Sequence, residues 1–291
     1  MISVIICSRY ELIDSDLKEN IEKTIGVKFE LIIINNSQNK YSIFEAYNLG
    51  IKQSKGEYLC FIHDDIFIHT NDWGKIISDI FEENNTVGLI GVAGSKVKTK
   101  MPSGWWNCPD DQKVINIIQH VKNDPEKWEY GFKTNDEKVE VIAVDGVFMA
   151  ARKDERIFFN TKLKGFHNYD LNFSFEYKKY DYKILVTNQI LIEHFSIGNL
   201  DEKWIDSTFE IHSIYRKYLP LKIDNQFTNK DLQILEFDNG SNFINRSLNL
   251  GIKKNVISIW FNLFCMKPYS PLYSKFFKKW IKLIIRKKST L

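Results

Sequence analysis

The first hundred residues alternate short apolar runs with longer segments of helical spacing, and this alternation constrains the fold more than any other feature. Ile and Val dominate the apolar runs, which favours buried β-strands. Strands are predicted at Ile2–Cys7, Phe29–Ile34, Glu57–Ile62 and Val87–Val92, and helices between them at Leu17–Ile25, Ile43–Gln53 and Trp73–Glu82. This order predicts an α/β fold with a Rossmann-like, mainly parallel central sheet and helices on both faces.

The rest of the chain carries a weaker pattern. The segment from about 95 to 140 is polar and is predicted to be irregular. Helical spacing resumes at Trp204–Tyr218, and we place a domain boundary near Pro220, between an α/β domain at 1–220 and a C-terminal extension at 221–291. Further strands are predicted at Val139–Val144, Val147–Ala151, Tyr182–Val186 and Ile190–Phe195.

Polar residues follow the first three predicted strands. They are Ser8-Arg9, Asn35-Asn36-Ser37 and His63-Asp64-Asp65. In open α/β sheets, ligands bind at the carboxyl ends of the strands, so we expect these residues to lie in one layer around a ligand. The adjacent carboxylates of Asp64 and Asp65 stand between apolar runs, where unpaired charges are costly, which suggests a bound cation.

Several enzyme classes are excluded by missing motifs. The sequence has no GxGxxG after its first strand and no GxxxxGK[ST], so the usual dinucleotide and phosphate cradles are absent. It has no GxSxG, HExxH or Cys/His zinc spacing. Its four cysteines form no CxxC pair, and its N-terminal residues lack the basic start of a signal peptide, so we expect a reducing, cytoplasmic location.

Six segments, in order, resemble the GT-A fold glycosyltransferases, specifically the family-2-like inverting group. The likeness covers about residues 1–218. It implies an enzyme that moves a sugar from a nucleoside-diphosphate sugar to a carbohydrate or lipid-linked saccharide acceptor, in bacterial surface polysaccharide or glycolipid synthesis. The segments are VIICSRYE, LIIINNS, AYNLGIKQSKGEYLCFIHDDI, VDGVFMAARKD, GFHNYDLNFSFEYKKYDYKI and IEHFSIG.

The resemblance implies a divalent metal site. Asp65 matches the metal ligand of the family, Asp64 the residue that contacts the ribose or the sugar, and His194 the second ligand. His63 replaces the first acidic residue of the usual triplet. A hard cation, Mn²⁺ or Mg²⁺, would neutralise the leaving diphosphate, and an imidazole ligand favours Mn²⁺. The alternative for His194 is a structural histidine at a strand end.

Nucleotide contacts are implied for the turns after the first two strands. Ser8 and Arg9 match the nucleotide-contacting turn, and the planar guanidinium of Arg9 suits a diphosphate. Asn35 and Asn36 stand where the family has acidic residues, so a nucleotide is expected but its base is left open. Plain turn chemistry is the alternative for Asn35-Asn36-Ser37.

Catalytic roles are implied for residues of the middle segments. Asp170 matches the base that takes the proton of the acceptor hydroxyl, and His167 is the second candidate because its pKa lies nearer neutrality. Asp145 is expected beside the donor sugar or the acceptor. The alternative for Asp170 is an N-cap of the helix that begins at Leu171.

Trp105 and Trp106 fall in a polar loop. Exposed indoles stack on sugar faces, so the pair is a candidate for carbohydrate contact. A small hydrophobic lid cluster is the alternative.

Two other functions compete with glycosyl transfer. A sugar nucleotidyltransferase would share an acidic metal site, but it needs a Gly- and basic-rich loop after the first strand, and CSRYELIDSD is not one. A non-catalytic sugar-binding module would not need both Asp145 and Asp170. Nucleic acid is not an expected partner.

The charge distribution sets the C-terminal region apart. The net charge is +3, yet residues 239–291 contain no Asp or Glu and eleven Lys or Arg. Such a basic segment suggests an anionic partner.

An amphipathic helix is predicted at about 271–288, where Ser270-Pro271 provides a start signal. Apolar residues on one side of this helix and lysines on the other predict peripheral attachment to the inner face of the cytoplasmic membrane. The alternative is that the apolar side packs on the transferase domain. The apolar side consists of Tyr273, Phe276, Phe277, Trp280, Ile281 and Ile284, and the basic side of Lys275, Lys278, Lys279, Lys282 and Arg286, extended by Lys287-Lys288.

Overall fold

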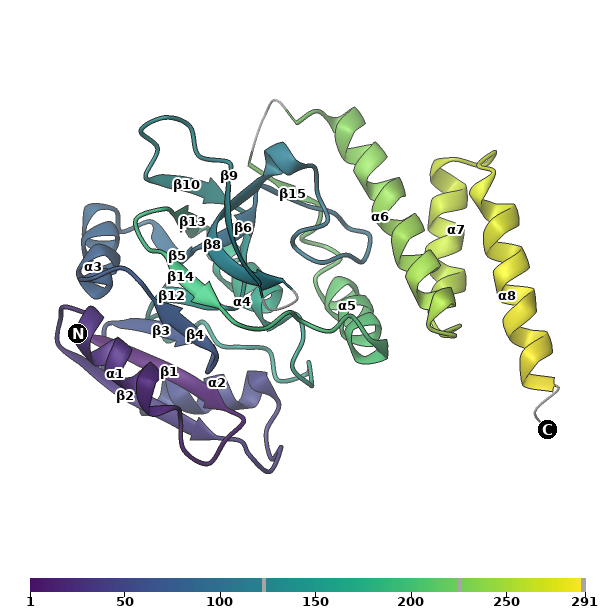
Figure 1. Ribbon diagram of the computed structural model, residues 1–291. Helices are drawn as coiled ribbons and strands as arrows, with labels where there is room; N and C mark the ends of the chain where they lie inside the picture. The colour runs from purple at the N-terminus through teal and green to yellow at the C-terminus, as the bar shows by residue number, and fades with distance from the viewer. Residues whose placement is uncertain (122–123, 224–226, 289–291) are drawn as a thin grey trace.

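The computed structural model describes residues 1–121, 124–223 and 227–288, with side chains up to Ile285, and is built on a seven-stranded sheet (Figure 1). Five of its strands share one direction, while β10 and β12 run opposite to their neighbours. The sheet order is β10 (Lys138–Val141), β13 (Lys183–Thr187), β5 (Val87–Gly91), β12 (Phe148–Arg152), β3 (Tyr58–Ile62), β1 (Ile2–Ser8) and β2 (Phe29–Asn35).

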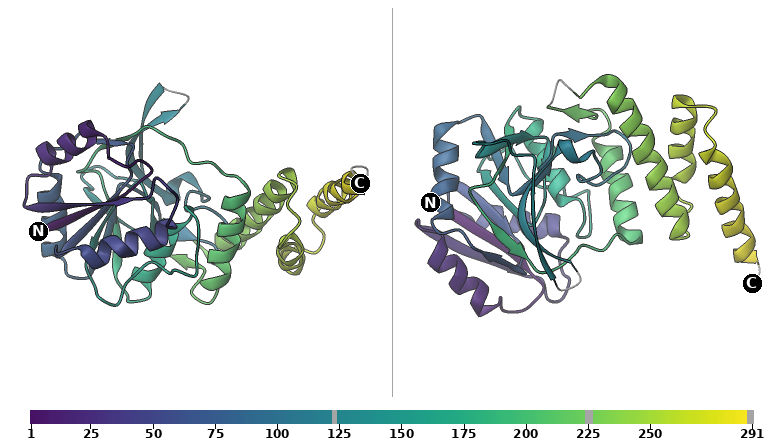
Figure 2. Two further views of the ribbon diagram at one scale, coloured as in Figure 1. Left: turned by 90° about the horizontal axis from the view of Figure 1, so that it is seen from below. Right: turned by 45° about the horizontal axis from the view of Figure 1, so that its top comes forward.

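Helices cover this sheet on both sides. Figure 2 (left) shows α1 (Ser15–Thr24) and α2 (Ile43–Gln53) on opposite sides of the N-terminal strands. A capping box between Ser42 and Glu45 starts α2. With α3 (Trp73–Glu83) and α4 (Tyr169–Lys178), these helices bury the apolar faces of the strands, and all five residues of β3 are buried. The predicted α/β class and the elements of the first hundred residues are confirmed.

A second, six-stranded sheet carries one wall of the candidate site. It orders β11 (Ala143–Val144), β6 (Ala93–Ser95), β8 (Lys113–Val121), β14 (Ile192–His194) and β4 (Ile66–Ile68), with β9 (Asp124–Tyr130) paired on β8.

The prediction of an irregular segment at about 95–140 is therefore wrong. Apolar and polar residues alternate too weakly in β8 for its sequence to predict a strand. The strand β9 is almost wholly polar and exposed, so only its pairing with β8 makes it a strand. The predicted strand Val139–Val144 is two strands, β10 and β11, which belong to different sheets. They separate at Ile142, whose N–H donates to the Ser95 carbonyl at 2.7 Å.

The C-terminal extension forms its own apolar cluster with α5 (Glu202–Ile214). It contains α6 (Asn229–Asn249), α7 (Val256–Met266) and α8 (Leu272–Lys288), while the short strand β15 (Leu221–Lys222) pairs with β7 (Val97–Lys98). Glu236 of α6 accepts hydrogen bonds from the backbone N–H groups of Lys100 and Met101 at 2.6 and 2.7 Å, which joins the extension to the α/β body. The predicted boundary near Pro220 lies between α5 and β15 and stays a prediction.

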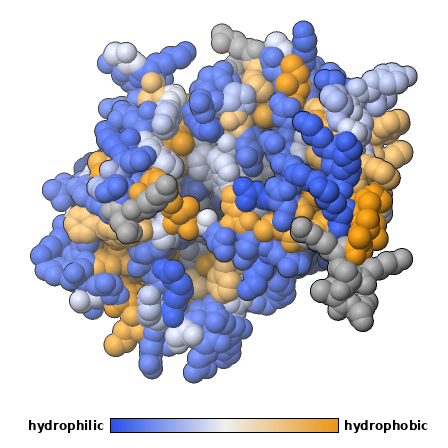
Figure 3. Space-filling model, turned by 45° about the vertical axis from the view of Figure 1, so that its right-hand side comes forward, coloured by the Kyte–Doolittle hydropathy of each residue, from blue (hydrophilic) through white to orange (hydrophobic). Residues whose placement is uncertain are grey.

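The apolar side of α8 is divided between packing and exposure. Phe276 is 3% exposed, and Trp280 and Leu283 also contact the cluster of α6 and α7, whereas Phe277 is 54% exposed. Much of the predicted lipid-facing side is thus covered by α6 and α7 and not by the central sheet. Near the end of α8, hydrophobic residues gather beside the grey C-terminal atoms (Figure 3). The side chains of Arg286, Lys287 and Lys288 lie outside the described residues.

Within the described residues, no helix has both the length and the apolar character required to cross a bilayer.

Candidate active site

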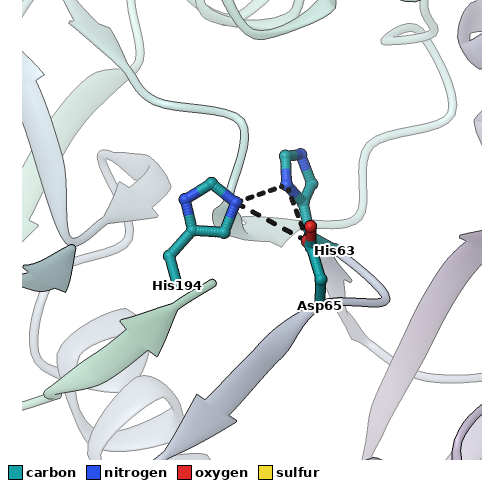
Figure 4. A group of neighbouring side chains, drawn as sticks. All are labelled: His63, Asp65 and His194. Atoms are coloured by element: carbon teal, nitrogen blue, oxygen red, sulfur yellow. Dashed lines mark hydrogen bonds and ion pairs between the residues drawn. The ribbon is translucent and has the colours of Figure 1, made fainter. Parts of the chain in front are cut away.

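Three side chains converge where β3, β4 and β14 meet (Figure 4). His63 follows β3, Asp65 precedes β4, and His194 ends β14. Antiparallel pairing of β14 with β4 sets His194 opposite Ile66, and the Phe195 N–H donates to the Asp65 carbonyl at 3.2 Å. Strand register therefore brings together residues that are far apart in the sequence.

The three potential ligand atoms form a compact triangle. His63 Nδ1 lies 3.3 Å from His194 Nε2, and Asp65 Oδ1 lies 3.6 Å from each of these nitrogens. Ligands on one cation with bonds of roughly 2.1 Å have similar mutual spacings, and two imidazoles with a carboxylate suit a transition metal. The structure brings the two proposed ligands Asp65 and His194 together and adds His63, which sequence reasoning had not assigned as a ligand.

Hydrogen bonds on the far side of each imidazole orient it toward the triangle. His194 Nδ1 lies 3.0 Å from Gln119 Oε1, so it donates and leaves Nε2 as an acceptor. His63 Nε2 bonds the Tyr169 hydroxyl, which leaves its Nδ1 facing the other two ligands. Neither Gln119 nor Tyr169 stood out in the sequence, because their role depends only on where β8 and α4 lie.

The protonation states also suit a cation. Burial would raise the pKa of the Asp65 carboxyl, but hydrogen bonding to His194 and the nearby His63 hold that pKa well below its usual range. Burial lowers the pKa of His63, and the neighbouring His194 lowers it further. The site therefore offers the Asp65 carboxylate and a neutral His63 imidazole beside His194, which is a donor set that fits a divalent metal.

Arg9 lies across the two adjacent carboxylates. Its backbone N–H donates to Asp64 Oδ2 at 3.0 Å, and its Nη2 lies 2.7 Å from Asp64 Oδ1 and 3.2 Å from Asp65 Oδ2. The hydrogen bond to Asp64 raises the pKa of Arg9, while its side chain stays 61% exposed. Asp64 thus holds the exposed guanidinium of Arg9 at the edge of the triangle, where this guanidinium can meet an anionic ligand.

In the turns after β1 and β2, some polar side chains bond the backbone of their own turn and others are free to contact a ligand. Ser8 is buried, and its hydroxyl accepts the N–H two residues on at 3.0 Å. Asn36 is also buried, and its amide bonds both backbone groups of Tyr41 at 2.9 Å, which favours turn chemistry for this residue. Asn35 is exposed and accepts from the N–H of Ser37 at 3.0 Å, so it remains the candidate for nucleotide contact.

Asp145 is held in place by two donors. Its Oδ1 accepts the Val147 N–H and its Oδ2 accepts Trp105 Nε1, both at 2.8 Å. Trp105 is only 6% exposed, so the expectation of an exposed indole is wrong for it. Its ring lies perpendicular to that of Trp106 at 5.9 Å, which is the cluster alternative, with Trp106 half-buried.

Asp170 lies in the first turn of α4, next to Tyr169. The N-cap of this helix is Asn168, so the N-cap alternative for Asp170 is wrong; its Oδ1 accepts the adjacent Leu171 N–H at 2.7 Å. Burial raises the pKa of the Asp170 carboxyl to about 7, and the charge of Asp145 adds to the rise. A carboxyl that titrates near neutrality suits proton transfer.

His167 faces a different neighbour. Its Nε2 lies 3.7 Å from Asp201 Oδ1 at the start of α5, and burial lowers the pKa of the imidazole. The charges that act on this pKa are those of Asp201 and Lys203, whereas Asp145 acts on both Asp170 and His63. His167 therefore faces α5, whereas Asp170 follows Tyr169, whose hydroxyl bonds His63 of the triangle.

Comparisons with known proteins show the family and the fold. Residues 3–217 match the model of a family described as "Glycosyltransferase like family". A crystal structure of S. aureus TarS 1–349 has a TM-score of 0.53 at 14% identity, covering 91% of this chain and 79% of that one. The same TarS fragment in complex with UDP-GlcNAc has a TM-score of 0.50 at 14% identity, covering 97% and 79%. No curated protein matches the sequence.

Proposed function

The chain belongs to the Glycosyltransferase like family and is a glycosyltransferase, and from this premise we propose a metal-dependent, inverting enzyme that uses a nucleoside-diphosphate sugar. The observation that carries the proposal is the convergence of His63, Asp65 and His194, with His63 hydrogen-bonded to Tyr169, the residue before Asp170. A donor-activating centre and a proton acceptor are the two parts that such a transfer needs.

The donor is proposed to be a UDP-sugar. The TarS fragment, which shares the fold, was solved with UDP-GlcNAc. In this chain the guanidinium of Arg9 is 61% exposed beside the metal ligands, and the donors that Asp64 and Asp65 do not engage can meet a diphosphate. Asn35 offers an amide toward the ribose or the base.

The proposed metal ligands are His63, Asp65 and His194. These residues would hold a divalent cation, Mn²⁺ in preference to Mg²⁺, which would supply positive charge for the diphosphate leaving group. Gln119 and Tyr169 keep the two imidazoles in the ligating tautomer and orientation.

Asp170 is the proposed base. The acceptor oxygen forms its bond to the anomeric carbon while the bond from that carbon to the diphosphate oxygen breaks, and the hydroxyl proton passes to the Asp170 carboxylate. Because the oxygen attacks opposite the leaving group, the configuration inverts. Asp145, fixed by the Trp105 indole, accepts a hydrogen bond from the donor sugar or the acceptor. His167 stays the second candidate for the base.

The acceptor is proposed to be a saccharide or lipid-linked saccharide, with the enzyme attached to the inner face of the cytoplasmic membrane. Support comes from exposed apolar side chains on α7, on α8 and in the turn between them, in a region with no acidic residue after Asp238. Apolar groups among lysines complement an anionic lipid surface, where each basic residue contributes about 1 kcal/mol. This setting fits bacterial surface polysaccharide or glycolipid synthesis. The exposed groups are Ile257, Phe261, Phe264, Met266, Tyr269, Phe277 and Ile285.

Product analysis tests the proposal directly. The purified chain is incubated with Mn²⁺ and a panel of nucleotide-sugars, with and without saccharide acceptors, and the released species are identified. A glycosyltransferase of this kind releases nucleoside diphosphate and loses that activity in EDTA. Pyrophosphate formed from a sugar phosphate and a nucleoside triphosphate would instead indicate a nucleotidyltransferase. Binding without any product would indicate a sugar-binding module.

A further inference from the structure

A pocket of about 450 Å³ lies between the α/β body and the C-terminal extension. One wall is the loop with Trp106, another is Trp204 of α5 with Leu200 before it, and the third is α6.

The lining has the composition of a carbohydrate site. It contains five asparagines, two tryptophans and one arginine, and no Asp or Glu. Each primary amide both donates and accepts, which matches the paired hydroxyls of a sugar ring. Four of the asparagines recur along α6 at spacings of three or four residues, which sets them along one side of that helix: Asn239, Asn242, Asn245 and Asn249.

The polar groups are held in place before any ligand binds. Asn239 Nδ2 donates to Thr99 Oγ1 at 2.9 Å and to the Asn107 carbonyl at 3.0 Å. Lys279 of α8 donates to the side-chain oxygens of Asn249, at 2.9 Å, and of Asn245, which fixes the orientation of both amides. Such preorganisation lowers the entropic cost of binding.

The aromatic wall is likewise ordered. The rings of Trp106 and Trp204 lie 6.2 Å apart at 33°, and the Arg246 guanidinium lies 5.7 Å from the Trp204 ring. Arg246 also donates to the Leu200 carbonyl at 3.3 Å. Trp204 is only 6% exposed, so the half-buried Trp106 is the indole that can meet the C–H face of a sugar. The guanidinium of Arg246 favours a ligand that carries a negative group.

The pocket adjoins the acceptor side of the proposed catalytic centre. Trp106 packs at right angles on Trp105, whose indole N–H holds Asp145. A saccharide in this pocket would therefore be separated from the catalytic carboxyl pair by one indole layer.

We infer that this pocket binds a saccharide unit of the acceptor glycan, next to the unit that reacts, and favours glycans with a carboxylate or phosphate near Arg246. The inference rests on the proposed function, since it takes the ligand to be the acceptor of that reaction. It adds a recognition site that the α/β body builds only together with α6.

A double variant of residues exposed on α6 tests the inference. Asn242→Ala with Arg246→Gln changes two exposed pocket residues, and Gln233→Ala on the exposed part of α6 outside the pocket is the matched control. Full-length proteins are applied to an array of neutral and anionic oligosaccharides. Each hit is then titrated by tryptophan fluorescence, with melting temperature as the check on folding.

We expect the unchanged protein and Gln233→Ala to bind the same anionic glycans, and the double variant to bind them at least about tenfold more weakly, since charged hydrogen bonds are lost. Binding by the double variant within twofold of the unchanged protein, or no glycan bound by the unchanged protein, would overturn the inference.

A separate measurement isolates the proposed function. The change in melting temperature with UDP and Mn²⁺ should be equal in the unchanged protein and the double variant. If the unchanged protein lacks that change but binds glycans through the pocket, the proposed reaction is wrong and the pocket assignment stands. If the change is present and the double variant binds glycans normally, the pocket assignment alone is wrong.

Discussion

The α/β body and the C-terminal extension use charge in opposite ways. In the body, titratable groups are enclosed in small clusters: the metal-ligand triangle and the pair Asp145 and Asp170. In the extension, the described lysines of α8 lie largely at the surface, beside exposed apolar residues of α7.

The difference teaches where each kind of function can reside. Enclosed charges interact strongly and shift one another's pKa values, so they suit chemistry that depends on protonation and metal binding. Exposed charges are screened by salt and act together, so they suit reversible attachment. Removing one residue should therefore abolish a function of the body, whereas several must change together to weaken a function of the extension.

The largest effect is expected from Asp65→Ala. This change removes the only carboxylate of the metal-ligand triangle, so transfer should fall to background. The change in melting temperature that UDP and Mn²⁺ produce should also disappear, as measured by thermal unfolding with and without EDTA. Asp79→Ala, an exposed carboxylate paired with Lys75 on α3, is the control and should behave like the unchanged protein. Full activity of Asp65→Ala would contradict the metal site.

Asp170→Asn should cut turnover by on the order of 10²–10⁴, the usual contribution of a positioned base, while donor affinity changes only a few-fold. Because burial raises the pKa of Asp170 to about 7, turnover of the unchanged enzyme should rise with pH through that value, as the carboxylate forms. The variant should lose this rise in a pH–rate profile. Normal turnover of Asp170→Asn together with a loss in His167→Ala would move the base to His167.

The same pKa makes a prediction about stability. A carboxyl whose pKa is raised on folding stabilises the folded state below its unfolded pKa, near 4, and this contribution is lost as pH rises through about 7. Asp170→Asn, which stays neutral, should therefore melt at a higher temperature than the unchanged protein at pH 8, and the difference should vanish toward pH 4. A melting-temperature difference of equal size at both pH values would show that burial does not raise the pKa of Asp170.

A smaller effect is expected from Tyr169→Phe, which removes the hydroxyl that bonds His63 and keeps the ring in the core. Loss of a partner behind a metal ligand typically weakens metal affinity about 10–100-fold. Titration with Mn²⁺ followed by melting temperature measures this loss. Tyr182→Phe, whose hydroxyl bonds Asp154 instead, is the matched control. Equal affinity in the two variants would remove Tyr169 from the metal site.

The smallest effect is expected from the extension. Truncating the chain before α8 would expose the cluster that Phe276 fills, so charge reversal is the cleaner change. Lys275→Glu, Lys278→Glu and Lys282→Glu together should weaken flotation with anionic vesicles at low salt roughly tenfold or more, because each basic residue contributes about 1 kcal/mol. High salt should release the unchanged protein.

Three lysines of the body, Lys18, Lys23 and Lys52, provide a control with the same change in net charge when they are replaced by Glu. Equal flotation of the two triple variants would show that α8 does not direct the protein to the membrane.

Local sequence pattern was enough to predict the scaffold. Helix α2 begins and ends as predicted, and β1, β2 and β3 agree within one residue at each end. These elements are read from runs of β-branched residues and from helical spacing, which act between near neighbours in the chain. The polar layer past the strand ends follows from the same pattern.

Tertiary structure decided which polar residues act together. His63, Gln119 and His194 meet because β14 pairs with both β4 and β8, and no local pattern encodes that register. The burial of Trp105 was hidden for the same reason, since a polar loop gives no sign that its indole will face Asp145. Sequence alone therefore determined the α/β scaffold and the polar residues available at its edge. Contacts between distant segments selected the metal ligands, raised the pKa of Asp170 and packed one side of α8 on α6 and α7. Strand pairing and burial depend on segments far away in the chain, so no local pattern could predict them.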